Sequence, residues 1–408
     1  MAQNIGQKYL IMSHQRGGDP ANANVPGTYP ARNNDSNDPL SGIQHPTTAE
    51  YDRAAGFETP STFTLGNQTV KAAQPWSTLP ADLRERFAFW HHPTYNSAHT
   101  DFDNTMRING AIKGPDGTGT DQIDSLIAQE TYASLNCVTR APISLGGTAI
   151  EFAGTSVPII RPRDIQSLFA SSINDLELMV NMRDRFIDQT YQQIKDNGTP
   201  AQKNFLDDYA ISREAAKNVG DNLANLLNGS SDPARIAVAL IQLNVSPLIT
   251  VGLGFGGDNH RDGDLINEVD STSDNAIPFI NTLWNELKRA NLQDSVVFSS
   301  LNVFGRTLVR NNDEGRDHNS EHHAMMAFGP NIKGGVVGGL EPYQRRRNQG
   351  DFKATAINSQ TGGSANPDIP HEETFVSVGK TLAKAVGVSD EQIEKRFDGG
   401  RIITGALT

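Results

Sequence analysis

Short runs of apolar residues, each followed by a polar turn, recur along this chain of 408 residues. The runs cover residues 8–13 (KYLIMS), 86–92 (RFAFWHH), 247–254 (PLITVGLG) and 295–301 (SVVFSSL). Because their apolar positions are nearly continuous instead of alternating with polar ones, the runs predict strands of a sheet that is covered on both faces.

Between these runs, apolar residues recur at helical spacing. The predicted helices span residues 121–134, 173–196, 200–227, 232–243, 276–290 and 371–386. Strands that alternate with helices predict an α/β fold with a mostly parallel central sheet and helices on both faces. We expect one domain over residues 1–408, with long loop excursions at 14–75 and 341–370 that form walls or lids of a site.

Composition narrows the classes of function. The net charge of −12 argues against nucleic acid as a partner, and no apolar run is long enough to span a membrane. The single cysteine, Cys137, excludes an intrachain disulfide framework and a cysteine-rich metal site. The oligomeric state stays open, a homo-oligomer included.

Histidine and carboxylate residues concentrate in residues 315–323 (GRDHNSEHH). This segment holds Asp317, His318, His322 and His323, whose oxygen and imidazole atoms suit zinc and also manganese or iron. The segment is therefore a candidate metal site, although a solvated loop that happens to be rich in histidine is the alternative.

Two further candidate ligand groups follow predicted strands. Asp258 and His260 come directly after the run at 247–254, and Asp19 follows the run at 8–13. An Asp-x-His triplet also caps helices and closes turns, and Asp19 alone is typical of a turn. Loops at the carboxyl ends of parallel strands meet at one edge of the sheet, which favours a shared site.

A fourth segment, residues 91–101, contains hydroxyl groups at the predicted start of a helix. Ser97 or Thr100 is a candidate nucleophile activated by a metal ion, and the helix N-terminus would help to hold an anion. Both residues suit N-capping equally well, so that structural role is the alternative.

Four motifs, in this order, carry a family resemblance: RGGDP (16–20), GFGGDNH (254–260), NVFGRT (302–307) and GRDHNSEHH followed by GPNIKGGVVGG (315–339). The sequence resembles a bacterial sulfatase-like family of unknown function in the alkaline phosphatase superfamily. It departs from that pattern in two extra glycines before Asp258, in Val303 at a position where the family has Glu, and in lacking a Cys/Ser-x-Pro-x-Arg sulfatase motif.

The resemblance implies an alkaline phosphatase-like three-layer sandwich with two metal subsites. It implies Asp258 and His260 in one subsite, completed by His322 or His323, and Asp19, Asp317 and His318 in the other. It also implies that Arg306 contacts an anionic substrate, unless that side chain only orients its loop. The expected cofactor is one or two divalent ions, zinc first, with manganese, iron or calcium as alternatives.

The leading functional hypothesis is a metal-dependent hydrolase of a small phosphate or sulfate ester, with Ser97, Thr100 or water as the nucleophile. A non-catalytic relative that serves as a binding or structural component is the second hypothesis. A metal-dependent enzyme acting on a carbohydrate is the third. The resemblance implies an exported, periplasmic protein, whereas the lack of a signal peptide in the chain as given is expected of a cytoplasmic one.

Overall fold

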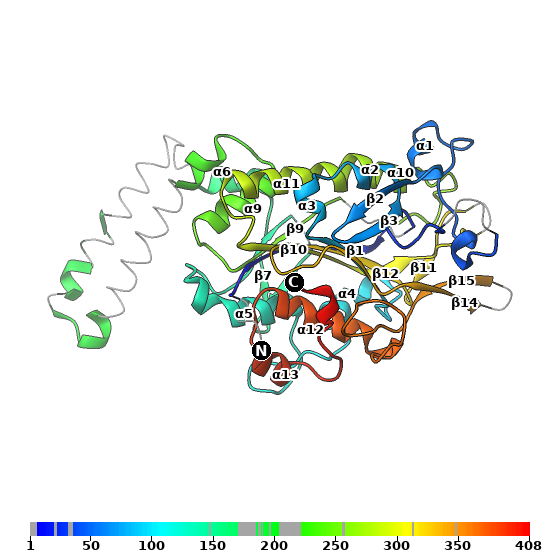
Figure 1. Cartoon of the computed structure of the whole chain (residues 1–408). Coiled ribbons are helices and arrows are strands. Elements are labelled where there is room, and N and C mark those ends of the chain that lie inside the picture. Colours follow the sequence, from blue (N-terminus) through cyan, green and yellow to red (C-terminus); the bar gives the residue numbers. More distant parts are fainter. Residues whose placement is uncertain are drawn as a thin grey trace.

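A nine-stranded sheet forms the centre of the protein (Figure 1). The computed structural model describes residues 6–19, 23–31, 36–146, 148–169, 185–186, 189, 191–195, 197–203, 222–254, 258–311, 314–346 and 349–408. The strand order is β13-β4-β12-β10-β1-β9-β5-β8, and β11 pairs with β10 at one end. The strands are β1 (Tyr9–Asp19), β4 (Phe87–His92), β5 (Ile143–Leu145), β8 (Ile159–Ile160), β9 (Leu248–Val251), β10 (Val296–Arg306), β11 (His318–Asn319), β12 (His323–Phe328) and β13 (Gly335–Val337).

Most strand pairs in this sheet are parallel. Strands β10, β1, β9, β5 and β8 run parallel in succession, and β13 is parallel to β4. Strand β12 is antiparallel to both β4 and β10, and β11 is antiparallel to β10. The fold is therefore mixed α/β with a mostly parallel central sheet.

Helices cover both faces of the sheet, as the continuous apolar runs predict (Figure 1). Helices α9 (Pro233–Gln242) and α11 (Ile277–Arg289) pack on one face, where their apolar residues join one large core cluster. Helices α5 (Ile123–Leu135), α12 (Thr374–Ala385) and α13 (Asp390–Arg396) pack on the other, around a second cluster. All residues of β4, β9, β10 and β12 are buried, which is typical of strands covered on both sides.

Short elements complete the described part of the chain. The helices are α1 (Ala55–Glu58), α2 (Gln74–Ser77), α3 (Ala81–Arg84), α4 (Phe102–Met106), α6 (Pro162–Phe169) and α10 (Ile266–Asp270). Three two-stranded sheets are β2 (Ser61–Leu65) with β3 (Gln68–Ala72), β6 (Ile150–Phe152) with β7 (Thr155–Val157), and β14 (Leu340–Arg346) with β15 (Gln349–Ala354). None of the helices in the described ranges has the length and apolar character needed to cross a membrane.

The four predicted strands are confirmed as β1, β4, β9 and β10, and four predicted helices are confirmed as α5, α9, α11 and α12. The predicted helices at 173–196 and 200–227 lie largely outside the described residues.

Three details of the prediction are wrong. Strand β10 continues to Arg306 through the predicted NVFGRT loop, because those positions pack into the core. His323 begins β12 instead of lying in a polar loop. The predicted excursions 14–75 and 341–370 contain the end of β1 and the hairpins β2–β3 and β14–β15.

Candidate metal site

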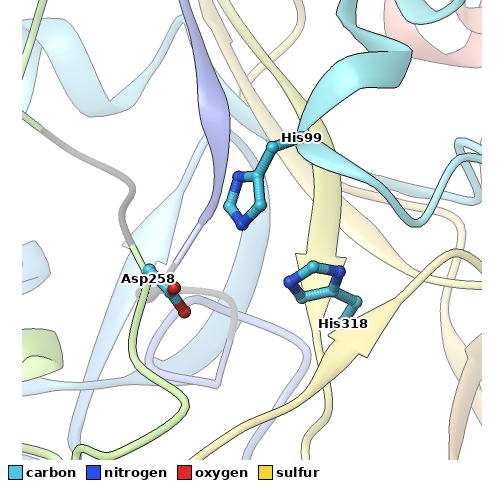
Figure 2. A group of neighbouring side chains, drawn as sticks. All are labelled: His99, Asp258 and His318. Carbon is cyan, nitrogen blue, oxygen red and sulfur yellow. The ribbon is translucent and has the colours of Figure 1, made fainter.

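Three side chains converge at the carboxyl edge of the sheet: His99, Asp258 and His318 (Figure 2). One potential ligand atom from each lies within 4.8 Å of those of the other two. His99 begins a short 3-10 helix (His99–Asp101) after β4, Asp258 follows β9, and His318 begins β11 after β10. Parallel topology thus brings together residues that are far apart in the sequence, as expected of such sheets.

Backbone carbonyls fix how two of these histidines present their nitrogens. His99 Nδ1 lies 2.8 Å from the carbonyl oxygen of Arg16, and His318 Nδ1 contacts the carbonyl oxygen of Ser97. Because a carbonyl can only accept, each Nδ1 carries the proton and donates it. Each Nε2 is then left with a lone pair, and this arrangement is common for histidines that bind metals.

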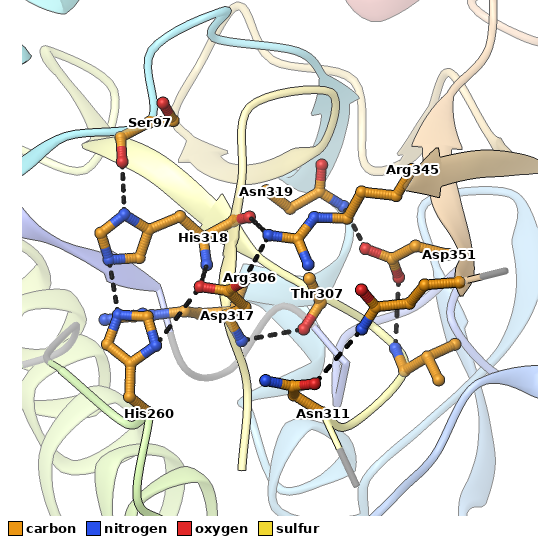
Figure 3. A network of polar contacts seen from close by, with 12 residues as sticks. Ser97, His260, Arg306, Thr307, Asn311, Asp317, His318, Asn319, Arg345 and Asp351 are labelled. Atoms are coloured by element: carbon orange, nitrogen blue, oxygen red, sulfur yellow. Dashed lines mark hydrogen bonds and ion pairs between the residues drawn. The ribbon is translucent and has the colours of Figure 1, made fainter. Parts of the chain in front are cut away.

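His260 joins the group from the other side (Figure 3). Its Nε2 lies 2.8 Å from His318 Nε2, while its Nδ1 lies 3.4 Å from a carboxylate oxygen of Asp317. If Asp317 holds the proton of His260 on Nδ1, the lone pairs of two imidazoles face each other. Two lone pairs at this separation repel unless a cation lies beside them. The Arg306 guanidinium, 3.3 Å from His260 Nε2, is one such cation, and a metal ion bound by both imidazoles would be another.

The aromatic ring of Phe304 positions both histidines. It stacks on the His318 imidazole with ring centroids 3.9 Å apart, and it contacts His99 edge-on at 5.0 Å. Phe304 is itself fully buried in β10. The two imidazoles therefore rest on a rigid surface.

Arg306, the last residue of β10, places a cation beside the group. Its side chain is 0% exposed, and its guanidinium lies 3.4 Å from Asp258 and 3.3 Å from His260 Nε2. Burial lowers the pKa of Arg306, although Asp258 opposes that shift. Gly18 on β1 allows this placement, because a Cβ there would lie 2.5 Å from Arg306 Nε.

The charges of the group favour ligation. Burial alone would raise the pKa of Asp258, but His260 and Arg306 outweigh it, so the pKa is lowered and the carboxylate stays ionised. Burial lowers the pKa of His318, which keeps its imidazole neutral near pH 7. An ionised carboxylate and neutral imidazoles are the forms that bind metals.

Asp317 contacts a basic residue and a histidine. One of its oxygens pairs with Arg345 Nη2 at 2.6 Å, and the other faces His260. Arg345 also donates to the His318 carbonyl at 2.9 Å, and it comes from β14 in the excursion at 341–370 (Figure 3). These contacts make Asp317 and Arg345 residues that orient the two histidines.

A buried ion pair ties the loops of the site together. Arg316 pairs with Glu268 of α10, both 0% exposed, and donates to the carbonyls of Thr307 and Leu308 at 3.0 and 2.8 Å. The backbone N–H of Arg316 donates to the carbonyl of Asn259, next to Asp258. This pair links the segment that carries His318 to the segment that carries Asp258 and His260.

Three other predicted ligands do not belong to the group of three. Asp19 is buried at the end of β1 beside Gly305, and it does not belong to the group of three. His322 and His323 are buried where β12 begins, in contact with His91 and with the backbone N–H of Asn302, respectively. The structure therefore brings together Asp258, His260, Asp317 and His318, whereas His322 and His323 contact other partners.

The predicted nucleophiles are exposed. Ser97 faces His318 with its carbonyl oxygen, while its hydroxyl points away from the imidazole (Figure 3). Thr100 lies in the 3-10 helix after His99, and the N-cap of that helix is Ala98, not Ser97. The alternative role of Ser97 as an N-cap is therefore wrong.

Sequence reasoning missed His99 and Arg345. His99 lies two residues after Ser97, within the segment 91–101 that supplied the candidate nucleophiles. Its position after a predicted strand could have marked it as a candidate ligand. Arg345 belongs to three consecutive arginines in a predicted loop, and no sequence signal tied it to Asp317.

Comparison with known families places the chain. A family model described as "Protein of unknown function (DUF1501)" matches residues 181–396, which is more than half of the chain. The chain belongs to this family. No curated protein matches it.

The predicted membership in a sulfatase-like family of the alkaline phosphatase superfamily is therefore wrong. The motifs behind that prediction are short groups of Gly, Asp and His at strand ends. Such groups arise in unrelated α/β proteins because loops meet at that edge of a parallel sheet. Of the group of three, Asp258 and His318 lie within the matched residues and His99 lies outside them.

Proposed function

Because this family has no known function, we propose one from the site itself: a metal-dependent hydrolase of a small phosphate or sulfate ester. In this proposal His99, His318 and Asp258 hold a divalent cation, with His260 as a fourth ligand. The observation that carries the proposal is the close approach of His318 Nε2 and His260 Nε2 while their Nδ1 atoms face acceptors.

The donor set fits zinc best, because two or three imidazoles and one carboxylate are typical zinc ligands. Manganese and iron also accept this set, whereas calcium prefers oxygen ligands and fits it least. When bound, such a cation polarises an ester oxygen and lowers the pKa of a water molecule.

Protein groups supply the rest of the proposed mechanism. Arg306 can donate hydrogen bonds to an oxygen that gains negative charge, and its burial strengthens that interaction. Asp317 would keep His260 in the tautomer that ligates. Because the hydroxyl of Ser97 points away, we infer that water and not Ser97 is the nucleophile.

The test begins with elemental analysis of protein purified without chelator or affinity metal. We expect about one equivalent of zinc or a related ion, lost in His99→Ala and in His318→Ala. His371→Ala is the matched control, because His371 is a partly buried histidine that pairs with Glu321 outside the group. The same metal content in all four proteins would contradict the proposed ligands.

Activity assays follow on the metal-loaded protein, with phosphate esters, sulfate esters and a panel of glycosides. Hydrolysis of an ester that stops in His318→Ala supports the proposal. Cleavage of glycosides alone would point to a carbohydrate enzyme. Metal binding without turnover of any substrate would point to a binding or structural role.

A further inference from the structure

A cavity of about 610 Å³ opens beside the candidate metal site. Asp258 and His99 form part of its lining, so the cavity and the metal group share a wall. Gly146, Ala149, Ile159 and Gly252 line it further along β5, β8 and β9, which makes that part largely apolar. Its volume matches that of pockets that hold small organic ligands.

Arg16 is the basic residue in this lining. It is exposed, and it forms no ion pair with any residue that the structure describes. Its guanidinium lies 5.9 Å from the centre of the Phe102 ring, which supports it from one side. Arginine in a cavity without a carboxylate partner has five donors available to a ligand.

A β-bulge places Arg16 there. In the pairing of β1 with β10, Gln15 faces Asn302 and Gly18 faces Phe304, so β1 contains an extra residue between them. Bulges redirect side chains and are frequent beside functional sites. The same bulge presents the Arg16 carbonyl to His99 Nδ1, so one residue orients a candidate ligand and also contributes a cation to the cavity.

We infer that Arg16 binds an anionic group of a ligand in this cavity, either a phosphate or a sulfate. This inference deepens the proposed function, because it rests on the cavity as the substrate site. The net charge of −12 does not attract anions to the protein as a whole, so recognition depends on local cations such as Arg16 and Arg306. The apolar lining then contacts the organic part of the ester.

The experiment measures the affinity of inorganic phosphate and of sulfate by calorimetry, with and without bound metal. Arg16→Gln removes the charge and keeps the backbone contact with His99. We expect it to weaken anion binding about tenfold or more, while Arg16→Lys restores part of the affinity and metal content stays unchanged. Arg140→Gln is the control, because Arg140 is exposed, lies outside the cavity and forms no ion pair within the described residues.

The outcomes separate the two proposals. If metal-loaded wild-type protein and metal-loaded Arg16→Gln bind the anions equally well, this inference is overturned and the proposed metal site is unaffected. Protein that holds no metal but loses anion binding in Arg16→Gln supports the inference and overturns the hydrolase. Wild-type protein that binds neither anion at concentrations of about 10 mM overturns the inference, because 10 mM corresponds to a binding free energy of only about −3 kcal/mol.

Discussion

Two sets of histidines lie at the same edge of the sheet, and they differ in how deeply their side chains are buried. The loop set consists of His99, His260 and His318. His99 and His318 converge with Asp258, His260 contacts His318, and His99 also lines the cavity. The strand set consists of four histidines that are fully buried where β4 ends and β12 begins: His91, His92, His322 and His323. His323 comes only five positions after His318.

Neighbours in the protein satisfy only some ring nitrogens of the strand set, because His92 Nε2, His322 Nδ1 and His323 Nδ1 are buried without a hydrogen-bond partner among the described residues. His91 Nε2 donates to the carbonyl of Pro26, so its Nδ1 accepts from His322 Nε2 at 2.8 Å. His92 stacks on Phe375 of α12. Burial lowers the pKa of all four histidines, which keeps them neutral. The histidine-rich motif thus combines a partly buried residue, His318, with two fully buried ones, His322 and His323.

The largest expected effect concerns the stability of the protein in acid. Burial lowers the pKa of His14, His91 and His92 to about 4 and that of His45 to about 3. The unfolded chain binds these protons near pH 6.5, so the stabilisation is complete above pH 6.5 and is lost as pH falls toward 4. We expect the free energy of unfolding, measured with urea, to drop by several kcal/mol across this window, at about 1.4 kcal/mol per pKa unit and histidine.

A single variant tests whether buried histidines cause this dependence of the free energy of unfolding on pH. His45 stacks on Tyr29 with ring centroids 3.8 Å apart, and His45→Phe keeps the stack but removes the titration. We expect the variant to unfold at a lower pH than the wild type. Burial raises the pKa of Asp124 to about 7, so this residue makes the protein more stable as pH falls. A protein that gains stability in acid would show that Asp124 outweighs the histidines.

The sequence predicted correctly that the candidate site lies at the carboxyl edge of the sheet, because that location follows from the topology of the strands. Apolar runs predicted β1, β4, β9 and β10, and the positions after those strands contain Asp258, His260 and His318. It could not separate His318 from His323, because both lie in one polar motif and only the strand β12 buries the second. It also could not find Arg345, whose link to Asp317 depends on how a hairpin folds back over the site.

The second prediction separates the two sets by metal affinity. His318→Ala removes a proposed ligand, and we expect the affinity for zinc to fall by at least about 100-fold, since losing even a supporting residue costs about 10- to 100-fold. Stability of the metal-free protein should change by less than about 1 kcal/mol, because His318 is only half-buried and lies in the two-residue strand β11. Competition with a chelating dye gives the first quantity and urea denaturation gives the second.

The third prediction is the converse variant in the strand set. His323→Ala leaves a cavity in the core and deprives the buried backbone N–H of Asn302 of its acceptor, which lies 3.1 Å away. We expect the free energy of unfolding to fall by about 2–4 kcal/mol while zinc affinity stays within about threefold of the wild type. Loss of zinc from this variant at full stability would reassign His323 to the metal site.

The fourth prediction tests the close packing of Gly18 against Arg306. Gly18→Ala places a Cβ 2.5 Å from Arg306 Nε, so the arginine must move away from Asp258 and His260. We expect a loss of about 1–3 kcal/mol in stability, the usual range for overpacking, together with weaker binding of phosphate. Gly363→Ala is the control, because a Cβ there makes only ordinary contact with Thr361.

The smallest expected effect comes from the hairpin that reaches back to the loop set. Arg345→Met keeps the length of the side chain but removes its pairing with Asp317 and its hydrogen bond to the His318 carbonyl. Asp317 can then turn away from His260, so we expect zinc affinity to fall about tenfold, as for other residues that orient metal ligands. The effect should vanish in an Asp317→Asn background, since the arginine acts through that carboxylate. Additive losses of affinity in the double variant would show instead that Arg345 acts only through its hydrogen bond to the His318 carbonyl. The hairpin would then support the backbone of the loop set and would not act through the charge of Asp317.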